Sequence, residues 1–110
     1  MTVLALIGVP LVIVDANGDE ETGDAFALPS RTVAIGWQTA FGSTPGAAEI
    51  NLEVAMDLAG PWTEIDSSTS TAGEFRNVTA PTAAQFIRAD VVDSSDEEAT
   101  VTIICKVAVP

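Results

Sequence analysis

The segment Glu49-Ile50-Asn51-Leu52-Glu53-Val54-Ala55-Met56-Asp57 decides the fold class. Apolar side chains occupy every second position from Ile50 to Met56, and the positions between them are mostly polar or acidic. Successive side chains of a β-strand point to opposite faces, so this period of two predicts a half-buried antiparallel strand. The chain therefore contains a sheet with one face in a core and the other in water.

The residues after this segment predict a hairpin. The run Leu58-Ala59-Gly60-Pro61 interrupts the alternation, and apolar residues resume at Trp62 and continue to Ile65. Glycine and proline together mark turns between periodic segments. We expect residues 62–65 to pair back onto the strand that begins at Glu49.

Similar short apolar runs recur along the chain and are separated by clusters of Gly, Pro, Asp and Ser, with no convincing helix between them. Further strands are expected at residues 3–7 and 11–14, or as one strand kinked at residues 8–10, and at residues 24–29, 32–41, 74–78, 85–92 and 100–107. In residues 85–92, Ile87, Ala89 and Val91 share one face. This pattern predicts an all-β fold, a single antiparallel β-sandwich of about 7–9 strands, with jelly-roll or immunoglobulin-like connectivity left open. One domain covers residues 1–110, with residues 1–14 as an apolar N-terminal strand or arm.

Composition argues against several functional classes. Four Lys and Arg residues stand against sixteen Asp and Glu, for a formal net charge of −12. Such a chain repels a phosphate backbone, so neither nucleic acid nor an anionic membrane surface is an expected partner. No histidine is present, which removes the Ser-His-Asp and Cys-His arrangements. We expect no enzyme activity and no cofactor, and Cys105, in an apolar alternation, should be a buried, unreactive thiol.

The acidic loop at residues 15–24 suggests calcium because oxygen-bearing side chains recur in it. An EF-hand loop needs glycine at its sixth position and glutamate at its twelfth, and counting from Asp15 these are Glu20 and Phe26. A solvated hairpin loop is the favoured interpretation, and no metal site is predicted. Whether this loop binds calcium stays open.

The chain has two tryptophans, Trp37 and Trp62, and exposed aromatic rings can form a platform on which sugars stack. Trp37 shares a face with Val33 and Ile35, which favours the core, and a buried indole usually finds one hydrogen-bond partner. Trp62 follows a turn and is the sugar-binding residue of an alternative hypothesis, a carbohydrate-binding or adhesion module.

Four segments together resemble small β-sandwich virion proteins of tailed bacteriophages, including capsid decoration or cement proteins. They are Leu52-Glu53-Val54-Ala55-Met56-Asp57, Gly60-Pro61-Trp62-Thr63-Glu64-Ile65, Thr71-Ala72-Gly73-Glu74-Phe75 and Phe86-Ile87-Arg88-Ala89-Asp90-Val91. The resemblance implies a non-enzymatic protein of the virion and does not identify its position there. The leading hypothesis is a decoration protein, made in the host cytoplasm, that lies on the capsid exterior and stabilises the shell by bridging capsid subunits. Its partners would be the major capsid protein or other virion proteins, and a tail or head-fibre component is a close variant.

The N-terminal segment is the expected attachment surface. It is apolar on both faces of any strand it forms, and a monomeric sandwich of this size would struggle to cover it. We therefore expect a homo-oligomer, most plausibly a trimer, and contact with the capsid through this segment. The expected partner-binding residues are Val3, Leu4, Leu6, Ile7, Leu11, Val12 and Ile13.

Overall fold

The structure, a computed structural model, describes residues 3–16, 21–81, 83–95 and 97–108. Nine strands and no helix lie within these residues, which confirms the all-β prediction. In chain order they are β1 (Val3–Ala16), β2 (Glu21–Thr22), β3 (Phe26–Ala27), β4 (Thr32–Phe41), β5 (Glu49–Ala55), β6 (Thr63–Ser68), β7 (Glu74–Thr79), β8 (Phe86–Asp93) and β9 (Ala99–Ala108).

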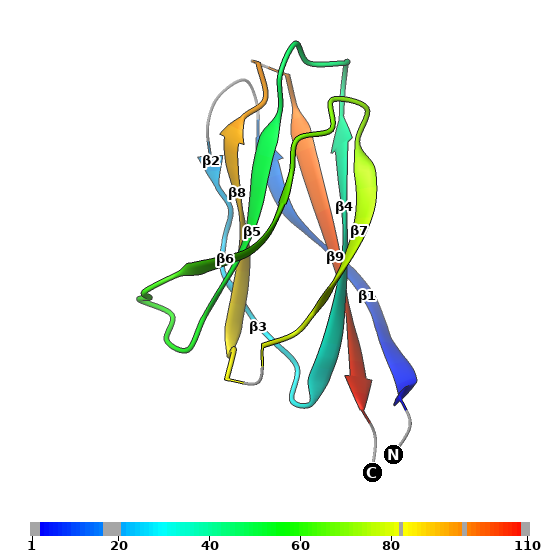
Figure 1. The fold of residues 1–110 in the computed structure, drawn as a ribbon, viewed down its shortest axis with the longest axis vertical. Coiled ribbons are helices and arrows are strands. Elements are labelled where there is room, and N and C mark those ends of the chain that lie inside the picture. Colours follow the sequence, from blue (N-terminus) through cyan, green and yellow to red (C-terminus); the bar gives the residue numbers. More distant parts are fainter. Residues whose placement is uncertain (1–2, 17–20, 82, 96, 109–110) are drawn as a thin grey trace.

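The strands form two antiparallel sheets that pack face to face (Figure 1). One sheet has the order β1-β9-β4-β7 and the other the order β2-β8-β5-β6, with β3 also paired to β8. Since β2 and β3 pair with successive parts of β8, they act as one interrupted strand. The resulting eight strands, four in each sheet, have the strand order of a jelly roll, which resolves the connectivity that the sequence left open.

The core lies between the two sheets and contains the inward residues that the alternation predicts. Ile50, Leu52 and Val54 of β5 are buried, and Ile35 and Trp37 of β4 are completely so. The same core contains buried residues of β8 and β9, among them Ile87, Ala89, Val91, Val101, Ile103 and Cys105. The predicted registers of β4, β5 and β8 are therefore confirmed, as is the burial of Cys105.

One residue of the opening segment departs from its expected position. The alternation placed Met56 on the buried face, but β5 ends at Ala55 and the Met56 side chain is 71% exposed. The chain leaves the sheet one residue earlier than the pattern suggests, because the turn to β6 begins before the apolar run ends. The hairpin itself forms as predicted, with Val54 paired to Thr63 and Ile50 to Ser68.

The N-terminal segment forms one long edge strand with an irregularity near its middle, the second of the two forms that the sequence predicts. β1 pairs antiparallel with β9 from Val3, opposite Ala108, to Ala16, opposite Ala99. The register shifts between Ile7 and Leu11, where the sequence contains Gly8, Val9 and Pro10. Proline has no backbone N–H to donate to a neighbouring strand, so an irregularity is expected there.

Candidate interaction surfaces

A polar network closes the side of the sandwich where β6 and β7 form the sheet edges. Asp66 of β6 accepts hydrogen bonds from Trp37 Nε1 at 2.9 Å and from Arg76 Nε at 3.0 Å and Nη2 at 3.1 Å. Arg76 also donates to Glu74 at 2.8 Å, and Glu74 accepts a second bond from Ser68 Oγ. Because Asp66 and Ser68 belong to one sheet and their partners to the other, this network joins the two layers.

The network shifts the ionisation of its members. Burial alone would raise the pKa of Asp66, but hydrogen bonds from Arg76, Trp37 and the Ser67 backbone outweigh it and hold that pKa below its ordinary value. Hydrogen bonds from Ser68 and Arg76 lower the pKa of Glu74. The same two carboxylates raise the pKa of Arg76. Asp66, Glu74 and Arg76 are thus charged at neutral pH and bound within the network, an arrangement suited to holding the fold together.

Arg88 and Trp62 form a second cluster, on the outer face of the five-stranded sheet. Arg88 Nε donates a hydrogen bond to Glu53 on the neighbouring strand at 2.7 Å. Its guanidinium also lies over the Trp62 ring, 4.2 Å from the centroid, as in a cation–π contact. One face of Trp62 is therefore covered, and Trp37 is buried, so the two tryptophans do not form a stacking platform for a sugar.

The outer faces of the two sheets differ in charge. On the five-stranded sheet, the strand registers align Glu49 with Asp93, Asn51 with Asp90, and Glu53 with both Glu64 and Arg88. On β4, β7 and β9 of the other sheet, the outward positions contain no acidic residue, and Lys106 is the charged one. These positions are Ala34, Gly36, Gln38, Ala40, Phe75, Asn77, Thr79, Thr100, Thr102, Ile104 and Lys106.

Apart from Lys106, this outer face of β4, β7 and β9 is uncharged, and it is called the uncharged face below. It has a shallow hollow. Phe75 is 57% exposed and lies against Gly36, where a Cβ atom would come within 2.9 Å of the ring. A hollow of about 270 Å³ lies beside the ring and reaches Ile104 and Lys106. Gly36 is therefore needed for the aromatic ring to lie flat along the sheet, and this face combines small, apolar and uncharged groups.

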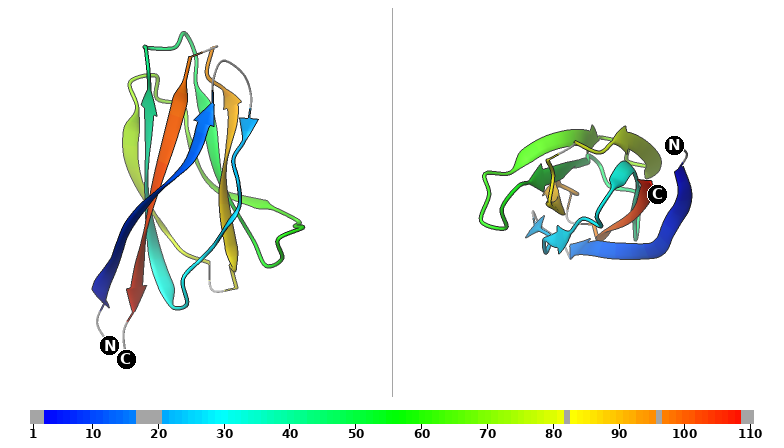
Figure 2. Two further views of the ribbon diagram at one scale, coloured as in Figure 1. Left: turned by 180° about the vertical axis from the view of Figure 1, so that it is seen from behind. Right: turned by 90° about the horizontal axis from the view of Figure 1, so that it is seen from below.

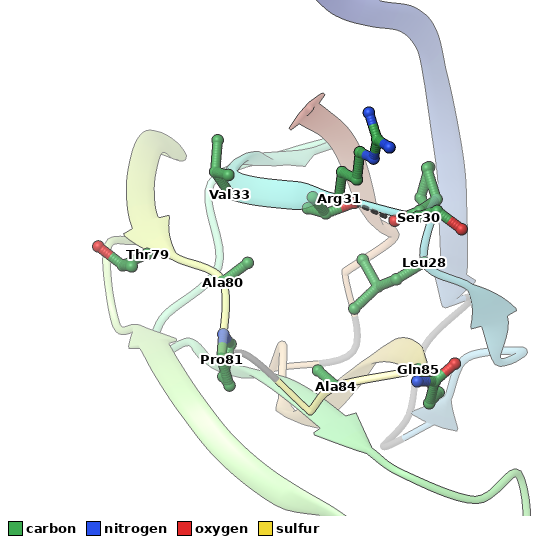
Figure 3. A pocket seen from close by; sticks show the side chains of 11 residues that line it. Leu28, Ser30, Arg31, Val33, Thr79, Ala80, Pro81, Ala84 and Gln85 are labelled. Carbon is green, nitrogen blue, oxygen red and sulfur yellow. Dashed lines mark hydrogen bonds between the residues drawn. The ribbon is translucent and has the colours of Figure 1, made fainter. Parts of the chain in front are cut away.

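A larger cavity, of about 530 Å³, opens at the end of the sandwich where β3 leads into β4 and β7 leads into β8 (Figure 3). Leu28, Ala80 and Ala84 supply apolar side chains to it, and Arg31 stands on its rim with its guanidinium directed away from them (Figure 3). Arg31 adopts a φ of 66°, in the left-handed region. This cavity was not predicted, because its walls come from segments more than forty residues apart in the sequence.

Beside this cavity the β5–β6 hairpin projects from the body of the molecule (Figures 1 and 2). Met56 and Leu58 near its tip are 71% and 57% exposed, and the acidic Asp57 lies between them. An apolar groove of about 300 Å³ follows the base of the hairpin, lined by Val54, Ile65 and neighbours that include Pro61 and Ala84. Sequence reasoning missed this surface because it assigned Met56 to the core.

Other candidate sites from the sequence fall partly or wholly outside these surfaces. Residues 17–20 of the acidic loop lie outside the described residues. Within the described ranges, no three Asp, Glu or Cys side chains are grouped so that they could hold a metal ion.

The predicted attachment residues lie in β1, which belongs to the same sheet as the uncharged face. In the part of the chain that the structure describes, no helix is long and apolar enough to cross a membrane.

The strand order places the protein among jelly-roll β-sandwiches, a fold found in viral capsid and lectin domains. A crystal structure with a similar fold is that of the SPBc2 prophage-derived protein YomS. The two chains superpose with a TM-score of 0.70 at 12% sequence identity, over 96% of this chain and 98% of that one. No protein-family model and no curated protein sequence matches the chain.

Proposed function

We propose that the protein is a non-enzymatic structural component of a phage virion that decorates the capsid exterior by binding capsid subunits. The observation that carries this proposal is the unequal charge of the two sheet faces. A protein with a net charge of −12 that keeps acidic residues off the outward positions of β4, β7 and β9 has one face suited to contact and one suited to water.

The position of β1 supports the same assignment. β1 lies beside β9 in the four-stranded sheet, so the residues expected to mediate attachment are next to the uncharged face. Val3, Leu4, Leu6, Ile7, Leu11, Val12 and Ile13 would extend that contact along the sheet edge. The virion context is supported by the sequence resemblance to decoration proteins and by the fold shared with a prophage-derived protein.

Acidic substitutions on the uncharged face test the proposal. Gln38→Glu with Thr79→Glu adds two negative charges to exposed outward positions of β4 and β7. The control, Thr69→Glu with Ala72→Glu, adds the same charge to exposed positions of the connection between β6 and β7. Shells purified from phage that lack the protein are mixed with each variant and sedimented.

Wild-type protein and the control should co-sediment with the shells in a fixed ratio, while the variant on the uncharged face should bind at least tenfold more weakly. Circular dichroism should show the same β-sheet signal for all three. Failure of the wild-type protein to bind shells, or equal binding by both variants, would refute attachment through this face.

A further inference from the structure

The tip of the β5–β6 hairpin has the composition of a contact surface rather than of a solvated turn. Met56 and Leu58 are two of the three large apolar side chains that are exposed among the described residues, and they stand on either side of Asp57. Solvent-exposed turns are usually built from small and polar residues. A projecting apolar tip of this kind marks a site of association.

The cavity at the end of the sandwich has a mixed lining with an apolar part. Leu28, Ala80 and Ala84 form that apolar part, and polar residues that include Ser30 and Gln85 complete the lining. Arg31 on the rim is exposed and makes no ion pair with any described residue. Arg76 and Arg88, by contrast, are each bound to a carboxylate. An occupant with an apolar end and one carboxylate would therefore match both the cavity and its rim.

The backbone at Arg31 adds a second reason to expect that its side chain is used. A φ of 66° is uncommon for residues other than glycine, asparagine and aspartate. Strain of this kind is concentrated at binding and functional sites. Glycine would fit this left-handed backbone with less strain than arginine does. What arginine adds at this position is a charged side chain.

We propose that the hairpin tip of one copy occupies the cavity of a second copy, with Met56 and Leu58 against Leu28, Ala80 and Ala84 and the Asp57 carboxylate beside Arg31. The tip and the cavity are different surfaces, so two copies can exchange tips in a two-fold dimer, or copies can join head-to-tail in a closed ring or a chain. A carboxylate–guanidinium pair fixes the direction of the contact. The contact does not depend on the proposed function, and of the outward positions of β4, β7 and β9 only Thr79 also lines the cavity.

A second copy of this chain brings the groups that the cavity and its rim require. The occupant must bring an acidic group with apolar neighbours, and this chain displays that combination on a projecting hairpin. The overall negative charge of each copy opposes association at low salt. At about 0.15 M salt the repulsion between distant charges is screened within about 8 Å, and the short-range contact dominates.

Sedimentation velocity over a concentration series at that ionic strength tests the contact. The tip variant contains Met56→Ser and Leu58→Ser, and the cavity variant contains Arg31→Asp, which the left-handed backbone tolerates and which repels Asp57. The control, Phe75→Ser, removes the third exposed large apolar side chain, from a different face. Wild type and control should associate equally, and the tip and cavity variants should associate at least tenfold more weakly.

Mixing the two defective variants gives the sharpest result. The tip variant retains an intact cavity and the cavity variant an intact tip, so an equimolar mixture should form a one-to-one dimer and nothing larger. A mixture that stays monomeric, wild-type protein that is monomeric throughout the series, or tip and cavity variants that associate like wild type would each overturn the proposal. Thermal unfolding of each variant establishes that it is folded.

Discussion

At the scale of single residues, Asp66 does the most to join the two layers. It binds the buried indole N–H of Trp37, from β4, and the guanidinium of Arg76, from β7, although it belongs to β6 of the other sheet. Its side chain is only 15% exposed, so water does not readily replace it as a partner. Loss of its carboxylate therefore leaves polar groups of the opposite sheet without an acceptor.

We expect Asp66→Ala to lower the free energy of unfolding by about 1–3 kcal/mol, the cost of leaving a buried donor without a partner. Asp66→Asn should cost less, because the amide oxygen still accepts from Trp37. Urea unfolding followed by tryptophan fluorescence measures both. Equal losses in the two variants would mean that the charge contact to Arg76, and not the bond to Trp37, is what matters.

At the scale of elements, the β5–β6 hairpin shows how a strand pattern translates into burial. Val54 is 5% exposed and faces β8, where it pairs with Ile87. Glu49, at the start of the same strand, is exposed. Glu53 is a poorer reference position, since it is bound to Arg88.

Val54→Asp should prevent folding, because it places an unpaired charge in the core, whereas Glu49→Lys should change the free energy of unfolding by less than about 0.5 kcal/mol. Circular dichroism and chemical unfolding distinguish the two. Comparable effects at both positions would mean that the strand is shifted by one residue, since such a shift exchanges every inward and outward side chain.

Strand positions and inward faces were predictable because alternation is a local property of the sequence. The need of Trp37 for a hydrogen-bond partner was predictable too, but the identity of that partner was not. Asp66 lies 29 residues further along the chain and on the opposite sheet, and no local pattern encodes which strands become neighbours. The cavity beside Arg31 depends on the same long-range pairing, and the exposure of Met56 depends on where the turn begins.

At the scale of the whole molecule, stability should depend on pH through the network at the sheet edges. The folded-state pKa values of Asp66 and Glu74 lie below their ordinary values of 3.8 and 4.5. Groups with lowered pKa values stabilise the fold above their unfolded-state pKa, and that contribution is lost as pH falls through the folded-state pKa.

We therefore expect the melting temperature to fall as the pH is lowered below about 4.5, with the loss continuing below the ordinary pKa of each group. Asp66→Asn should flatten this dependence, since it removes one of the titrating groups. Calorimetry across the acid range makes the comparison. An equally steep fall in the variant would assign acid sensitivity to carboxylates outside the network.

The uneven charge of the two outer faces also affects how the free protein approaches a binding partner. With acidic groups gathered over β5, β6 and β8 and none on the outward positions of β4, β7 and β9, the free molecule carries an electric dipole across its thickness. Near a negatively charged surface, that dipole turns the acidic side away and presents the uncharged side first. At low ionic strength the net charge of −12 slows the approach to such a surface while the dipole orients the molecule, and both effects fade as salt is added.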